Sequence, residues 1–138
     1  MNDNILCVDG DVEQPLQLGF ADLCSFPAAE QVLDVSRLHP KRQGDGVLLS
    51  AIIDRARPKP TASRVVLHAS GDGFSANVSL EAVRDEGIVA YQLHDEPMPA
   101  SAGGPFRFLL RHATACGTSE LDDCSNVKYL DRIEISAE

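Results

Sequence analysis

Residues 64–110 of the chain read RVVLHASGDGFSANVSLEAVRDEGIVAYQLHDEPMPASAGGPFRFLL, and this stretch decides the fold. Residues 65–69 form an apolar run of the β type, and the Asp72-Gly73 pair that follows is a turn signal. Residues 74–80 then alternate apolar and polar side chains, which is the period of a half-buried strand. This order predicts a strand, a turn and a second strand.

The rest of the stretch predicts a short helix, a strand, a rigid loop and a further strand. Ser79 is a good helix N-cap and Gly87 is a helix stop, so we expect a helix between them. Residues 88–93 are apolar and indicate the next strand. Prolines and glycines crowd residues 97–105, which predicts a rigid loop that leads into a strand at residues 106–110.

Residues outside this stretch add further elements. We expect strands at residues 5–8 and 32–36 and a helical turn at residues 21–25. Residues 127–136 predict one more strand. Its apolar face is formed by Val127, Tyr129, Ile133 and Ile135.

The clearest helix pattern covers residues 46–57, and Pro58 ends it. Its apolar residues recur with helical spacing, so one face of the helix packs on the sheet. That face consists of Leu48, Leu49, Ile52, Ile53 and Ala56. Short strands mixed with short helices predict an α+β fold. No repeat or linker divides the 138 residues, so we expect one domain over residues 1–138.

The net charge of -9 excludes two classes of partner. Nucleic acid requires a basic face, and an anionic membrane surface attracts basic segments, so we expect neither. No apolar run approaches the roughly 20 residues of a transmembrane helix. The first residues contain no basic region followed by an apolar segment, so we expect a cytoplasmic protein.

The cysteines Cys7, Cys24, Cys116 and Cys124 are scattered and form no CxxC pair. We expect Cys7 and Cys24 to be small buried hydrophobic residues. Cys116 and Cys124 flank an acidic loop. They are either free surface thiols or, alternatively, partners in a disulfide or a shared metal site.

The order of these motifs resembles the molybdopterin-binding domain of the sulfite oxidase family. That family has an Asp-Gly-aromatic turn, a His-Gly-x-Pro-x-Arg loop and a Val-Lys-Trp-like strand. The equivalents here are Asp72-Gly73-Phe74, residues 102–107 and Val127-Lys128-Tyr129. The resemblance implies a mixed, mostly antiparallel, multi-layer sheet with short helices.

The resemblance also implies where a cofactor binds. Arg107 and Lys128 match the family's loop arginine and its Val-Lys cation, and the resemblance places Lys128 beside the Gly103-Gly104 loop. Both cations are able to hold a phosphate, which favours a small anionic or phosphate-bearing ligand, with molybdopterin itself as a candidate. Alternatively, Arg107 forms an ion pair on its strand and Lys128 is solvated.

A second cationic segment lies in the loop at residues 37–46. His39, Lys41 and Arg42 form either an anion site or an ordinary solvated loop. In the family, the loop before the helix at residues 46–57 supplies a cysteine thiolate that binds molybdenum. Here that loop contains Ser36 and no cysteine, and Ala102 replaces the family's histidine.

These departures predict a binding or accessory module with a degenerate metal site, so we expect no molybdenum. An alternative is a working molybdopterin-dependent oxidoreductase that uses Ser36 or another non-cysteine ligand. A second alternative is a structural or interaction module without a ligand. The sequence leaves the substrate and the electron partner open.

Overall fold

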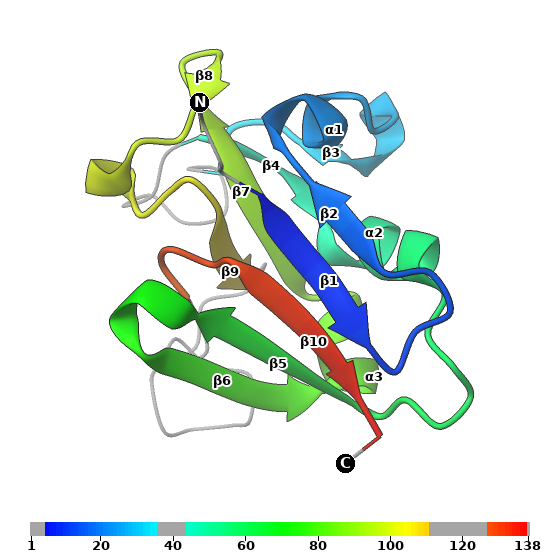
Figure 1. The fold of residues 1–138 in the computed structure, drawn as a ribbon. Helices are drawn as coiled ribbons and strands as arrows, with labels where there is room; N and C mark the ends of the chain where they lie inside the picture. The colour runs from blue at the N-terminus through cyan, green and yellow to red at the C-terminus, as the bar shows by residue number, and fades with distance from the viewer. Residues whose placement is uncertain (1–4, 36–43, 111–126, 138) are drawn as a thin grey trace.

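The computed structural model describes residues 5–35, 44–110 and 127–137, and its strands form two sheets (Figure 1). The first sheet contains β2 (Leu16–Leu18), β1 (Leu6–Gly10), β10 (Arg132–Ser136), β5 (Arg64–Ala69) and β6 (Phe74–Ser79), in that order. The second contains β3 (Gln31–Val32), β4 (Asp45–Leu48), β7 (Gly87–Leu93) and β8 (Glu96–Pro97), and β9 (Arg107–Leu110) also pairs with β7. Only the β1–β10 pair is parallel among these strand pairs, so the mixed, mostly antiparallel α+β prediction is confirmed.

Short helices connect the two sheets. The helices are α1 (Phe20–Cys24), α2 (Leu49–Ala56) and α3 (Leu80–Arg84), and the 3-10 turns are η1 (Ala28–Glu30), η3 (Ser70–Asp72) and η4 (Ala100–Ala102). Helix α1 contacts β2 of the first sheet and β7 of the second, while α2 contacts β4 and β7 and α3 contacts β5 and β6. None of the helices in the described part of the chain is long and apolar enough to cross a membrane.

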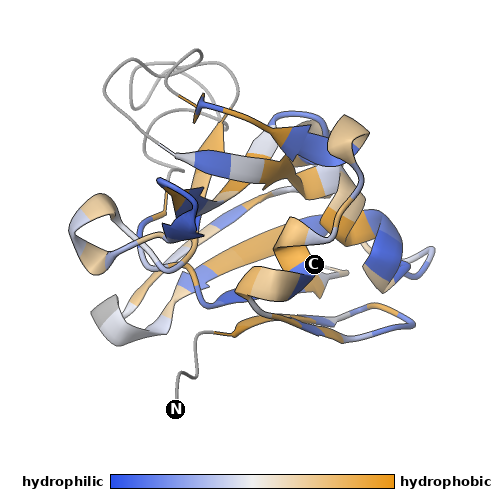
Figure 2. Cartoon of the chain, turned by 90° about the horizontal axis from the view of Figure 1, so that it is seen from above, coloured by the Kyte–Doolittle hydropathy of each residue, from blue (hydrophilic) through white to orange (hydrophobic). Residues whose placement is uncertain are grey.

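The main core lies between the sheets and includes α2. Ile133 and Val65 come from the first sheet, Val89 and Phe108 come from the second, and Ile52 comes from α2; all five side chains are fully buried. In Figure 2, apolar (orange) residues run along strands in the middle of the molecule, and hydrophilic (blue) residues lie largely at its periphery. Removing this apolar surface from water is the main stabilising contribution to the fold.

Several local predictions are confirmed. Strands β5 and β6 form where the alternation predicts them, and η3 connects them with Gly73 at a φ of 66°, a left-handed conformation that favours glycine. Ser79 caps α3, because its Oγ accepts a hydrogen bond from the backbone N–H of Ala82 at 3.3 Å. Phe74 departs from the expected pattern, since 43% of it is exposed.

The helix predicted from residue 46 begins later, at Leu49. Residues Asp45–Leu48 form β4, which pairs with β7. A Cβ on Gly46 would lie 2.6 Å from the carbonyl oxygen of Val89, so the glycine permits this close strand approach. The apolar face of α2 is otherwise as predicted, with Leu49, Ile52, Ile53 and Ala56 buried.

Two predicted strands are shorter than expected. Strand β3 covers only Gln31–Val32, because Leu33 is 65% exposed and Asp34 has a φ of 61°. Strand β10 begins at Arg132, so the prediction that Tyr129 shares the apolar face with Ile133 is wrong. Tyr129 has a φ of 58°, which turns the chain before the strand begins.

The predicted burial of two cysteines is also wrong. Cys24 is exposed at the end of α1, and Cys7 is only half-buried because it lies on the outer face of the first sheet. Cys116 and Cys124 lie outside the described residues, so the choice between free thiols and a bridge stays a prediction.

Candidate functional site

The loop before β9 lies beside the segment that leads to β10. The backbone N–H of Tyr129 donates to the carbonyl oxygen of Gly103 at 2.8 Å, and the N–H of Leu130 donates to that of Phe106 at 2.8 Å. These two bonds hold the chain around Lys128 against the glycine loop. The backbone at Lys128 therefore runs beside this loop, and a ligand-binding role for Lys128 stays a prediction.

Gly103 separates two cationic side chains. Its φ is 98°, and a Cβ at this position would lie 3.0 Å from Cδ and Nη1 of Arg107 and 3.3 Å from Cγ of Lys128. The bare Cα thus leaves room for the guanidinium of Arg107 and for the aliphatic stem of Lys128. We call Gly103, Arg107 and Lys128 the cationic corner.

Within the cationic corner, Arg107 is held firmly and Lys128 is not. Arg107 is only 8% exposed, and its Nη1 donates to the carbonyl oxygen of Ala102 at 3.0 Å. Lys128 is exposed and makes no ion pair with another described residue. A buried, oriented guanidinium beside a solvated ammonium is an arrangement that suits an oxyanion such as phosphate.

Of the remaining predicted site residues, the structure describes only Gly104. A Cβ on Gly104 would lie 2.1 Å from the carbonyl oxygen of Met98, so this glycine permits a backbone contact within the loop. Ser36, His39 and Arg42 lie outside the described residues. The described residues contain no group of three or more His, Cys, Asp or Glu side chains placed to hold a metal ion.

The cationic corner lies on the side of β9 that faces away from the main core. Successive side chains of a strand point to opposite faces. Phe106, Phe108 and Leu110 join the main core, whereas Leu109 joins a smaller outer cluster with Ile88 and Ala90. Arg107 alternates with Phe106 and Phe108, so its guanidinium belongs to the outer side.

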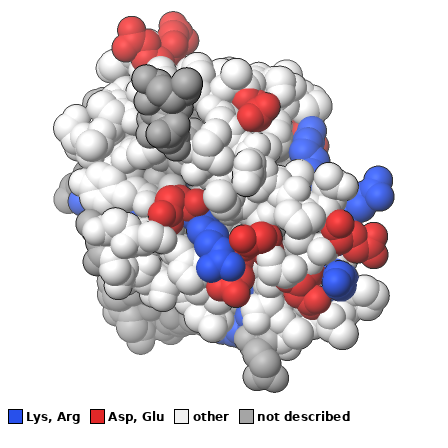
Figure 3. All heavy atoms as spheres, viewed as in Figure 1, with Lys and Arg blue, Asp and Glu red and all other residues white. Residues whose placement is uncertain are grey.

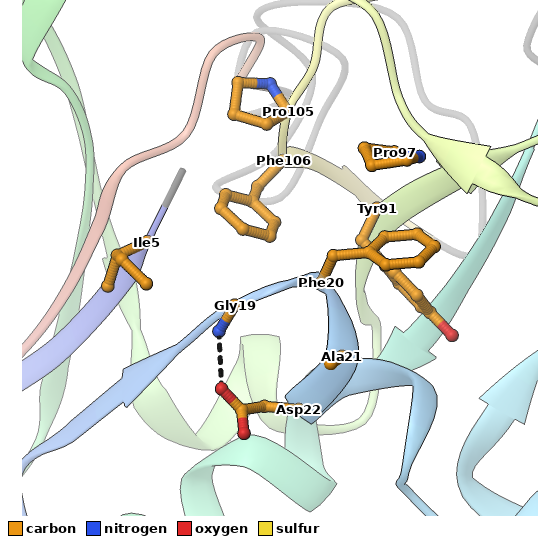
Figure 4. A pocket seen from close by; sticks show the side chains of 9 residues that line it. All are labelled: Ile5, Gly19, Phe20, Ala21, Asp22, Tyr91, Pro97, Pro105 and Phe106. Atoms are coloured by element: carbon orange, nitrogen blue, oxygen red, sulfur yellow. Dashed lines mark hydrogen bonds between the residues drawn. The ribbon is translucent and has the colours of Figure 1, made fainter. Parts of the chain in front are cut away.

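A pocket lies on the inner side of the same loop (Figure 4). Its volume is about 240 Å³, and it is lined by Ile5, Gly19, Phe20, Ala21, Asp22, Tyr91, Pro97, Pro105 and Phe106. The rings of Phe20 and Tyr91 meet edge to face with centroids 5.7 Å apart. None of these described lining residues is a lysine or an arginine.

Sequence reasoning missed this pocket because its residues come from five separate segments. Tyr91 is its most constrained member, with a hydroxyl that donates to Oε1 of Gln31 at 2.8 Å. Burial raises the pKa of Tyr91 to about 12, and the neighbouring Cys24 adds to the increase. The hydroxyl of Tyr91 is therefore neutral at ordinary pH, and its hydrogen bond to Gln31 links β7 to β3.

The outer face of the first sheet carries charges of both signs side by side (Figure 3). Arg132 Nε lies 2.9 Å from Oδ1 of Asp9, and His68 Nε2 lies 2.9 Å from Oε1 of Glu134. These side chains pair across neighbouring strands. Arg132 on this face is therefore paired with a carboxylate, whereas Lys128 in the cationic corner pairs with no described carboxylate.

Comparisons with known proteins identify the family. The profile of the oxidoreductase molybdopterin binding domain matches residues 41–138. The uncharacterized oxidoreductase YuiH of Bacillus subtilis (strain 168) is 32% identical over 114 residues, which are 78% of this chain and 56% of YuiH. The sulfane dehydrogenase SoxCD of Paracoccus pantotrophus has the same fold, with a TM-score of 0.69 and 21% identity over 99% of this chain.

The match to SoxCD covers 39% of that chain, so this chain spans about half or less of each of these two proteins. The profile match extends over most of the 138 residues and includes the cationic corner. The chain belongs to the oxidoreductase molybdopterin binding domain family.

Proposed function

We propose that this domain binds the phosphate-bearing end of a molybdopterin-type ligand at the cationic corner. The observation that carries the proposal is that the guanidinium of Arg107 and the stem of Lys128 both pack against the bare Cα of Gly103. Two like charges repel each other, and an anion between them removes that repulsion. In a chain with a net charge of -9, such a pair of cations favours a local anion site.

The side chains of the cationic corner fit a phosphate in different ways. The guanidinium of Arg107 is planar and presents a fixed fork of donors, one of which Ala102 already orients. The ammonium of Lys128 is a point charge on a flexible stem that is able to follow the ligand. Arg107 therefore supplies geometry, and Lys128 supplies mainly charge.

The metal-binding end of the ligand has to be considered separately from its phosphate. When bound in an oxidoreductase, molybdopterin supplies dithiolene sulfurs that hold molybdenum, and a protein thiolate completes a soft ligand set. Residues 34–46 contain no cysteine. We therefore propose a binding or accessory role for the domain, in which the pterin phosphate is held and the thiolate to the metal is missing.

A titration tests the phosphate site. Wild type, Arg107→Ala and Lys128→Ala are titrated calorimetrically with phosphate, sulfate and a pterin phosphate. Loss of a hydrogen bond to a charged group costs about 1.5–3 kcal/mol, so Arg107→Ala weakens binding at least about tenfold. The matched control is Lys59→Ala, which removes an exposed cation outside the cationic corner and leaves binding unchanged.

Two results contradict this site. If the wild type responds to none of the three ligands, the structural-module alternative replaces the proposal. If Arg107→Ala and wild type respond equally, the ligand binds elsewhere, and the loop with His39 and Arg42 becomes the next candidate.

Elemental analysis tests the absence of the metal. The protein is produced in a host that makes the molybdenum cofactor, and we expect far less than one molybdenum per chain because residues 34–46 supply no thiolate. A near-stoichiometric molybdenum content contradicts the degenerate site and supports an oxidoreductase with another ligand.

A further inference from the structure

The edge strands of the two described sheets are β2, β3, β6, β8 and β9, and β6 is the longest of them. An edge strand presents unpaired backbone N–H and C=O groups, which favour pairing with another strand. Strand β2 has three residues, β3 has two and β8 has two, one of which is Pro97. Strand β6 has six residues, and no described strand pairs with its outer edge (Figure 1).

Strand β6 lacks the features that usually prevent edge pairing. Its sequence, FSANVS, contains no charged residue and no proline. The pairing of β6 with β5 is regular over all six residues. Phe74, at the start of the strand, leaves 43% of its surface in contact with solvent. This is a regular edge without a carboxylate and with an exposed aromatic ring, in a chain whose net charge is -9.

We infer that β6 pairs with β6 of a second copy of this chain, antiparallel and about a twofold axis. A second copy is the occupant that the charges favour, because two acidic chains approach with least repulsion along a strand that carries no carboxylate. Antiparallel pairing of identical strands also closes on itself, as a twofold interface must. The two five-stranded sheets then form one continuous sheet.

The alternation of β6 selects the register. Phe74, Ala76 and Val78 share the inner face with their partners on β5, so they must oppose inner-face residues of the second copy. With Ala76 on the twofold axis, Phe74 lies opposite the second copy's Val78. An aromatic ring opposite a β-branched side chain is a favourable cross-strand pair, and it occurs twice in the dimer.

The register displaced by one residue toward α3 is less favourable. With Asn77 on the axis, Phe74 lies opposite Leu80, where the strand has already become α3. The exposed ring of Phe74 then has no cross-strand partner on β6 of the second copy. The first register covers Phe74 and is the one we assign.

The size of the contact determines its strength. One pair of six-residue strands is small compared with a standard interface of about 800 Å² per partner. We therefore expect a weak dimer that forms with rising concentration rather than a permanent one.

Sedimentation velocity over micromolar to near-millimolar concentration tests the dimer. Wild type is compared with Ser75→Lys, which adds a charge to the exposed edge strand opposite the second copy's Asn77. Arg64 donates to the side chain of Asn77 at 2.9 Å, so the new lysine meets a like charge there. The control is Gln17→Lys, an exposed position on β2 at the other edge of the same sheet.

We expect wild type and Gln17→Lys to dimerise equally and Ser75→Lys to dimerise at least tenfold more weakly. Circular dichroism confirms that each variant is folded. A wild type that stays monomeric over the whole range overturns the inference. A dimer that Ser75→Lys leaves unchanged also overturns it, because the contact then lies elsewhere.

Cross-linking tests the register. Opposed Cα atoms in an antiparallel pair lie about 4.5–5.5 Å apart, within the range of a disulfide. Ala76→Cys on the axis therefore forms a covalent dimer on mild oxidation. Asn77→Cys is displaced along the ladder and forms one more slowly, and wild type measures the background from the native cysteines. Equal cross-linking of the two variants contradicts the assigned register.

Discussion

The inner and outer sides of β9 are built from alternate residues of one short segment, and they serve different purposes. On the inner side, Phe106 and Phe108 join a core that receives residues from both sheets and from α2. On the outer side, Arg107 lies beside a small apolar cluster and a glycine that permits a second cation to approach. Neighbouring residues of this segment therefore have different roles: one packs in the core, and the next belongs to the candidate ligand site.

This difference teaches which substitutions change stability and which change binding. The inner side is close-packed, so each methylene contributes to the free energy of unfolding. The cationic corner consists of a few polar groups rather than a packed apolar cluster. Substitutions should therefore separate the two properties, and the following experiments are ordered by the size of the expected effect.

The largest effect belongs to the inner side. Ile52→Ala removes a fully buried side chain from α2 and should lower the free energy of unfolding by about 2–5 kcal/mol, because it leaves a cavity. Urea denaturation measures the change, and Glu81→Ala at an exposed position of α3 is the control. A loss below about 0.5 kcal/mol, the usual range for a surface change, contradicts the central position of Ile52.

The second effect concerns the buried phenol of the pocket. The pKa of Tyr91 is about 12 in the folded chain, against an ordinary value of 10.0. The unfolded chain thus loses this proton at lower pH than the folded chain. The stabilisation is complete below pH 10 and is lost as the pH rises toward 12.

Each pKa unit corresponds to 1.36 kcal/mol, so the loss is on the order of 2 kcal/mol. Urea denaturation at increasing pH measures it, with Tyr91→Phe as the variant that lacks the titrating group. The stability of wild type should fall more steeply than that of Tyr91→Phe between pH 10 and pH 12. Parallel pH profiles contradict the raised pKa.

A substitution on the outer side of β9 should have the smallest effect on stability and the largest effect on phosphate binding. Gly103→Ala places a Cβ 3.0 Å from Arg107 at a φ of 98°, and left-handed strain costs roughly 1–2 kcal/mol. The same Cβ separates Arg107 from Lys128, so the response to phosphate should be lost. Thermal unfolding with and without phosphate measures both effects.

Gly71→Ala is the matched control for this variant, because a Cβ there has no neighbour within 4 Å. It should retain the wild-type stability and the response to phosphate. A Gly103→Ala protein that still binds phosphate as wild type does would place the anion outside the cationic corner.

Elements whose conformation depends on residues nearby in the sequence could be predicted from the sequence. Alternation defines β5 and β6, the side chain of Ser79 caps α3, and the proline-glycine loop precedes β9. The order of these motifs also pointed to the family, since each motif reflects a local conformation that any member must adopt. The missing cysteine in residues 34–46 is likewise a property of the sequence alone.

Other features were decided by contacts between distant segments. The helix-like pattern from residue 46 yields to β4 because pairing with β7 satisfies the backbone there, and Tyr129 turns outward because the chain must enter β10. The sequence by itself determined the α+β elements, the charges and the family of this chain. Only the tertiary structure decided that Arg107 and the stem of Lys128 both pack against Gly103, and that no described strand pairs with the outer edge of β6. These features depend on which strands pair, whereas periodicity reports only each strand's own faces.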